Sequence, residues 1–262
     1  MDLDLTGKHA LVCGGSQGIG LATAQALAAL GADVTLLARR AELLQTLADD
    51  LPRPAAGQVH GWIAVDGTDT DALKAQVGAL AAGKPVHILV NNSGGPAPGP
   101  VHGTDIAAFE AAYRQHLIAN HVLAEAVIPG MQIDGYGRIV NVISTSVKEP
   151  IKGLGVSNTT RWAVASWAKT LATELAPHGI TVNNVLPGST QTPRIEQIID
   201  TRASRTGRSR ADIHAEMVAE IPLGRFARPE ETAAAIAFLC SPAAGYITGI
   251  NLPVDGGRTR SL

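Results

Sequence analysis

The segment "CGGSQGIG", residues 13–20, lies between the short apolar run "HALVC" and the alanine-rich stretch "LATAQALAALG". The run before it has the length of a strand, and the stretch after it has helical spacing. Gly14, Gly18 and Gly20 stand where a chain must turn tightly, expose backbone N–H groups to a phosphate, and bring a helix close to a strand. Glycines alone are a weak signal, but the strand and helix around them predict a dinucleotide-binding βαβ unit.

The same alternation of short apolar runs and longer helical patterns continues along the chain. The later strand-like runs are "DVTLLAR", "VHGWIAVD", "VHILVNNSG", "GRIVNVIS", "ITVNNVLPG" and "GINLPVD". Helices are expected over about 69–82, 104–130, 158–176 and 230–240, with Asn158 at a capping position. Seven strands with helices between them predict an α/β fold, a Rossmann-type doubly wound and mostly parallel sheet in a single domain over residues 1–262.

One region, residues 189–222, departs from this regular pattern. It is polar, contains several arginines and lies between two regular units. Two interpretations are open: a solvated pair of surface helices, or a mobile lid that closes over a substrate.

Composition excludes several classes of function. With 45% hydrophobic and only 3% aromatic residues, the core must consist of Ala, Val, Leu and Ile. A formal net charge of −2 offers no attraction for nucleic acid or an anionic membrane. The acidic N-terminus does not resemble a signal peptide, and no apolar run approaches the ~20 residues of a membrane span, so a cytoplasmic protein is expected. Two cysteines are too few to predict a disulfide framework, and the histidines do not have the spacing of metal ligands.

Several ordered motifs resemble the short-chain dehydrogenase/reductase family over nearly the whole chain. They are the Gly14, Gly18 and Gly20 spacing, an acid at Asp66, "NNSG" at 91–94, "LPG" at 186–188 and "GYITGINLPVDGG" at 245–257. The resemblance implies a nicotinamide nucleotide at this end of the sheet. The positions expected to contact it are Gly14, Ser16, Gln17, Gly18, Ile19, Gly20, Arg39, Arg40, Asp66, Asn92, Gly94, Arg161, Pro187, Gly188, Thr190 and Thr192.

The choice of nucleotide depends on the end of the second strand, "LLARR". An acid there would bind both ribose hydroxyls and repel a 2′-phosphate, but the chain has Ala38, Arg39 and Arg40. Because a guanidinium binds phosphate bidentately, NADP(H) is favoured over NAD(H). Alternatively, one or both arginines only solvate a helix start, an interpretation that suits Arg40 better than Arg39.

The catalytic positions depart from the family pattern. The family uses a serine after the fifth strand, a tyrosine thirteen residues later, a lysine four further, and an asparagine on the preceding long helix. Ser144 matches the serine, whereas Ser157 and Arg161 occupy the tyrosine and lysine positions. His116 matches the asparagine, and Asn120 lies one turn later on the same face.

These replacements leave the source of the proton open. A serine hydroxyl such as that of Ser157 can donate a hydrogen bond but is a poor acid. Arg161 stays cationic and can hold ribose hydroxyls. His116, with an unperturbed pKa of about 6.5, suits general acid catalysis, or else only packs on its helix. A water molecule and the substrate itself are the other sources of the proton, and a conjugated or iminium-like substrate would ease the last route.

Three hypotheses follow for the function. The first is an NADP(H)-dependent oxidoreductase for a carbonyl, alcohol or conjugated small molecule with an atypical proton donor. The second is an inactive nucleotide-binding homologue, acting as a sensor or partner subunit, and the third is a lyase or isomerase on the same scaffold. The substrate is expected between Ser144, the 96–100 loop, residues 148–154 and the 189–222 segment. The family resemblance also implies a homotetramer, or a homodimer.

Overall fold

The computed structural model describes residues 1–261, which contain one seven-stranded sheet of order β3-β2-β1-β4-β5-β6-β7. Every neighbouring pair is parallel, which confirms the predicted doubly wound fold. Central strands are buried on both faces, as runs of Val, Ile and Leu require. The strands are β1 (His9–Cys13), β2 (Asp33–Ala38), β3 (Gly61–Ala64), β4 (Ile88–Asn91), β5 (Gly137–Val142), β6 (Ile180–Pro187) and β7 (Asn251–Val254).

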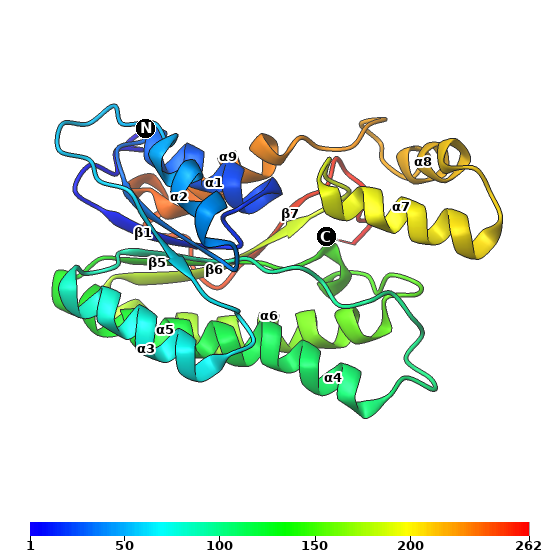
Figure 1. Cartoon of the computed structure of the whole chain (residues 1–262), viewed down its shortest axis with the longest axis horizontal. Coiled ribbons are helices and arrows are strands. Elements are labelled where there is room, and N and C mark those ends of the chain that lie inside the picture. Colours follow the sequence, from blue (N-terminus) through cyan, green and yellow to red (C-terminus); the bar gives the residue numbers. More distant parts are fainter. Residues whose placement is uncertain (262) are drawn as a thin grey trace.

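Helices cover both faces of the sheet. Figure 1 shows α1, α2 and α9 on one face and α3, α5 and α6 on the other. Within residues 1–261 no helix has the length and apolarity that a membrane crossing requires. The helices are α1 (Gly18–Ala29), α2 (Ala41–Asp49), α3 (Thr70–Gly83), α4 (Ile106–Tyr113), α5 (Ala119–Asp134), α6 (Gly155–Leu175), α7 (Pro193–Thr206), α8 (Arg210–Ala219) and α9 (Pro229–Cys240).

Two apolar cores lie on opposite faces of the sheet, because successive side chains of a strand point to opposite sides. In β1, Ala10 and Val12 contribute to the core under α1 and α9. Leu11 and Cys13 contribute to the core under α3, α5 and α6. This alternation fixes the register of β1, and therefore the direction in which the glycine turn leaves the sheet.

The start of α6 differs from the sequence-based expectation. The helix begins at Gly155, three residues before Asn158, so the prediction that Asn158 caps it is wrong. The Asn158 amide instead donates to the Ile151 carbonyl (2.9 Å) and accepts from the Ile151 N–H (3.4 Å). A Cβ atom on Gly155 would lie 2.5 Å from Val101 Cγ2, so close packing places the helix start here.

The long helix expected over about 104–130 is present, but it is not regular. A π-helical turn, η1 (Arg114–Ile118), separates α4 from α5, and α5 extends to Asp134. Such a turn changes the face on which the following side chains project, and π-bulges often lie at functional sites.

The segment 189–222 forms the helix pair α7 and α8, which lie together at one end of the molecule (Figure 1). The pair has its own small core, whose members are Ile195, Ile199, Ile213, Ile221 and Phe226. The predicted helix pair is confirmed, while closure over a substrate stays a prediction.

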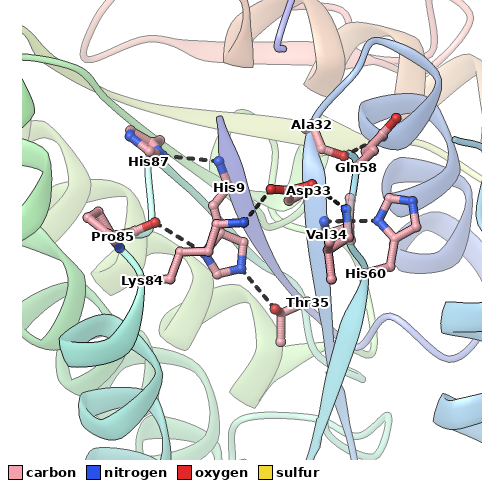
Figure 2. A network of polar contacts seen from close by, with 11 residues as sticks. His9, Ala32, Asp33, Val34, Thr35, Gln58, His60, Lys84, Pro85 and His87 are labelled. Carbon is pink, nitrogen blue, oxygen red and sulfur yellow. Dashed lines mark hydrogen bonds and ion pairs between the residues drawn. The ribbon is translucent and has the colours of Figure 1, made fainter. Parts of the chain in front are cut away.

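A buried polar network joins the amino ends of the strands (Figure 2). The ring of His9 donates from Nδ1 to the Pro85 carbonyl (3.1 Å), and its Nε2 lies 2.8 Å from Thr35 Oγ1. Because a carbonyl only accepts, Nδ1 carries a proton; in the neutral ring Nε2 then accepts from the threonine. The His9 backbone N–H donates to His87 Nδ1 (3.0 Å). Because Nδ1 of His87 accepts this bond, the His87 ring is neutral in the network.

Acid is expected to destabilise the protein through His9. Burial, and then the cation of Lys84, lower the pKa of His9 to about 4. The unfolded chain binds a proton near pH 6.5 and the folded chain only near pH 4, so stability falls as the pH decreases across this window, by about 3 kcal/mol for His9. Burial also lowers the pKa of His60 and His87, which adds to the loss.

Urea unfolding between pH 7.5 and 4.5 checks this expectation. The His9→Gln variant, which keeps polar contacts but does not titrate, is expected to show a shallower dependence on pH. An identical slope in the two proteins would contradict the assignment to His9.

Candidate active site

A cleft of about 960 Å³ opens at the carboxyl ends of the strands. It lies across β1 and β4, where the strand order reverses and where doubly wound sheets bind ligands. Gly20 and His116 do not line it. The predicted residues in its wall are Gly14, Ser16, Gln17, Gly18, Ile19, Arg39, Arg40, Asp66, Asn92, Gly94, Ser144, Ser157, Arg161, Pro187, Gly188, Thr190 and Thr192; Asn120 also lines it.

Close packing explains the glycines of the turn after β1. Gly14 has φ +61°, and a Cβ atom there would lie 2.6 Å from Asn92 Nδ2. A Cβ atom on Gly20 would lie 2.2 Å from the Gly14 carbonyl oxygen. Gly20 therefore supports the site without lining it, because its lack of a side chain lets α1 pack directly against the turn. Across the cleft, Thr192 Cγ2 would be 3.1 Å from a Cβ atom on Gly18.

The first turn of α1 is open to an anion. Its N-cap residue, Gln17, makes no side-chain capping bond, and the turn contains no acid. The backbone N–H groups of this turn therefore face the cleft together with the positive end of the helix dipole. This arrangement fits a pyrophosphate group.

The side chains at the end of β2 are arranged for a second phosphate. Arg39 and Arg40 are exposed and line the cleft directly after Ala38. Asp66, after β3, accepts hydrogen bonds from the Thr68 N–H (2.9 Å) and hydroxyl (2.8 Å). These bonds, with the nearby charge of Arg39, lower the pKa of Asp66. The position that would bind ribose hydroxyls carries no acid, so a 2′-phosphate fits.

Two hydroxyls lie at the other end of the cleft. Ser144 follows β5 and accepts a hydrogen bond from the Ser146 N–H (3.1 Å), so its own proton remains available to a bound oxygen atom. Ser157 lines the same cleft from α6, one turn before Arg161. Ser144, Ser157 and Arg161 therefore all line one cleft.

Arg161 is a buried cation that lines the same end of the cleft as the two hydroxyls. Its side chain is only 7% exposed, and Nη1 donates to the Val142 carbonyl at the end of β5 (3.1 Å). Nε is buried without a partner among residues 1–261. Burial, and then the charge of Arg194, lower the pKa of Arg161 to about 10, so it stays charged at neutral pH.

His116 lies in η1 and is 1% exposed. Its Nδ1 is hydrogen-bonded to Ser93 Oγ (2.7 Å), and Nε2 has no partner in the described part of the chain. Burial, and then the cation of Arg161, lower the pKa of His116 to about 2. The ring is therefore neutral at physiological pH, which argues against His116 as a charged proton donor. Its expected titration near pH 6.5 assumed solvent exposure that the π turn does not provide.

Sequence reasoning missed Arg194. It lies in the first turn of α7, lines the cleft, and donates from Nη2 to the Pro96 carbonyl (2.8 Å). No motif indicated it; the available signal was an arginine just after Thr190 and Thr192, which were predicted to contact the cofactor. Within residues 1–261 no three His, Cys, Asp or Glu side chains gather as metal ligands.

Comparisons with known proteins agree with this geometry. A family model described as "Enoyl-(Acyl carrier protein) reductase" matches residues 14–259. L-xylulose reductase of Mus musculus is 36% identical over 258 residues, covering 98% of each chain. The solved structure of L-sorbose reductase from Gluconobacter frateurii, complexed with NADPH and L-sorbose, has a TM-score of 0.92 at 31% identity and full coverage of both chains. A solved "short chain dehydrogenase/reductase family protein" is 35% identical, with a TM-score of 0.80 and coverage of 97% and 99%. The chain belongs to the short-chain dehydrogenase/reductase family.

Proposed function

We propose that the protein is an NADP(H)-dependent oxidoreductase that acts on a conjugated carbonyl compound, with a proton supplied by water rather than by a tyrosine. One observation carries this proposal: the Ser144 hydroxyl and the buried Arg161 cation line the same end of a nucleotide-sized cleft. Among residues 1–261, no acidic side chain lines that end.

The cofactor assignment depends on the residues at the far end of the cleft. The open first turn of α1 holds the pyrophosphate, and Arg39 holds the 2′-phosphate. NADPH bound in the related L-sorbose reductase supports the same choice here. When bound, the nicotinamide supplies or accepts a hydride.

Replacing Arg39 with alanine is expected to weaken NADPH binding about 10- to 50-fold and to leave NADH binding nearly unchanged. The loss corresponds to a charge-assisted hydrogen bond of about 1.5–2.5 kcal/mol. Fluorescence titration of both nucleotides measures it. Arg40→Ala, on the adjacent exposed residue, is the matched control with a smaller expected loss. Equal weakening of NADH and NADPH would contradict a phosphate contact at Arg39.

The chemistry follows from what the side chains can and cannot do. Ser144, with Ser157 beside it, donates a hydrogen bond to the substrate oxygen, and Arg161 stabilises the negative charge that develops there. An alkoxide would need an acid matched to neutral pH, but the serines and Arg161 are poor acids, and His116 is neutral. The enolate of a conjugated carbonyl is protonated at carbon, where water serves as the donor. The site therefore favours conjugated substrates over isolated ketones.

A panel of enones, each paired with its saturated ketone, tests the proposal. NADPH oxidation is expected with enones and is expected to be much slower with the saturated partners. Tight NADPH binding without oxidation of any compound would favour a nucleotide-binding homologue without catalytic activity. Product formation without a change in nicotinamide absorbance would favour a lyase or isomerase.

A further inference from the structure

Two guanidinium groups converge at the substrate end of the cleft. Arg161 approaches from α6, and Arg194 approaches from the start of α7. Both reach Gly95: a Cβ atom built there would lie 3.5 Å from Arg194 Nη2 and 4.0 Å from Arg161 Nη2. Each group is held by one backbone carbonyl, of Val142 and Pro96 respectively. Both arginines line the same cleft as Ser144 and Ser157.

No acid neutralises these two cations within residues 1–261. In the described part of the chain neither forms an ion pair, and Asp66, near Arg39 at the nucleotide end, is the only acid that lines the cleft. Two like charges close together in a partly buried site are unfavourable without an anion. Six of the thirteen other arginines have acidic partners; these are Arg202, Arg208, Arg210, Arg225, Arg228 and Arg258.

The phosphate groups of the nucleotide have their own sites. The first turn of α1 suits the pyrophosphate, and Arg39 suits the 2′-phosphate. The Arg194 guanidinium is instead bonded to the Pro96 carbonyl, in the 96–100 loop that is expected to border the substrate. Arg161 is bonded to Val142, two residues before Ser144. Arg161 and Arg194 therefore line the cleft together with Ser144 and Ser157, the hydroxyls proposed to bind the substrate.

We propose that the substrate carries a carboxylate, which Arg194 binds as a planar fork with Arg161 as the second cation. A guanidinium matches a carboxylate in shape and offers two parallel hydrogen bonds. Because Arg194 belongs to α7, substrate binding would also anchor the helix pair α7 and α8 to the body of the protein. This inference rests on the proposed function, since it identifies the substrate class of the same site.

The test measures binding to the protein saturated with NADP⁺, so that it does not depend on turnover. The probes are keto acids and their primary amides, among them levulinate and the enone acetylacrylate. In the wild-type protein we expect the acids to bind at least about tenfold more tightly than the amides, as a charge-assisted pair requires. In Arg194→Gln this preference is expected to disappear, while the NADPH dissociation constant stays within about twofold. Arg194→Lys is expected to keep part of it.

Arg205→Gln is the matched control, because Arg205 lies on α7 but is exposed and outside the cleft. It is expected to behave like wild type. Two results would overturn the inference: no acid that binds better than its amide, or a loss of NADPH affinity in Arg194→Gln that parallels the loss for acids, which would assign Arg194 to the nucleotide. A protein that prefers acids but oxidises NADPH with none of the probes would contradict the proposed function alone.

Discussion

The Gly20→Ala variant is expected to bind NADPH at least about 100-fold more weakly than the wild-type protein, a loss of about 2.7 kcal/mol. The added methyl group would lie 2.2 Å from the Gly14 carbonyl oxygen and 2.7 Å from Asn92 Nδ2. Backbone atoms cannot give way cheaply, so α1 or the turn after β1 must move. Either movement displaces the N–H groups that bind the pyrophosphate. Fluorescence titration measures the affinity, and thermal unfolding establishes that the variant is folded.

Gly78→Ala is the matched control for this substitution. Gly78 lies within α3 and has no atom within 4 Å of its expected Cβ position. Alanine there is expected to leave NADPH binding unchanged and to stabilise the helix by about 0.5–1 kcal/mol. A folded Gly20→Ala protein with wild-type affinity would refute the proposed role of the close contact between helix and turn.

The Ser144→Ala variant is expected to lower kcat on the best enone by about 100- to 1000-fold, the usual effect of removing one donor to a developing oxyanion. NADPH affinity is expected to remain unchanged, because Ser144 lies at the substrate end of the cleft. Since Ser144 also accepts from the Ser146 N–H, the variant should lose about 1 kcal/mol of stability, which is much less than its loss of catalysis.

Two further variants distinguish the loss of the Ser144 hydroxyl from a general effect on folding. Ser144→Thr retains an O–H and is expected to recover part of the activity, whereas Ser166→Ala, on an exposed position of α6, should have no effect. If Ser144→Ala kept full kcat, the substrate oxygen would have to be bound elsewhere, and the assignment of Ser144 would fail.

Much of the fold was predictable because its determinants are local. The glycine spacing of residues 14–20, the buried strand runs and the helical patterns each act within about 20 residues. The start of α6 was not, because it depends on the packing of Gly155 against Val101, which belongs to a distant loop. Asparagine is a common N-cap residue, but Asn158 instead holds the backbone of Ile151 in the preceding loop.

The candidate site divides in the same way. The positions of Ser144, Ser157 and Arg161 followed from a gap-free register between β5 and α6. The ionisation of His116 could not be predicted, because it depends on burial in η1 and on the Arg161 cation from another helix. The position of Arg194 in the cleft could not be predicted for a related reason, since the carbonyl that holds it belongs to Pro96, 98 residues earlier in the chain.

The separation of the His9 network from the cleft affects how activity will respond to acidity. Burial lowers the pKa of His116 to about 2 and that of Arg161 to about 10, so neither group changes charge near neutral pH. His9 lies at the amino end of β1, away from the cleft, and burial lowers its pKa to about 4, so acid protonates it although it touches no reacting atom. The acidic limb of a rate profile would therefore not identify a general acid; in this protein it would report the fraction of molecules that remain folded.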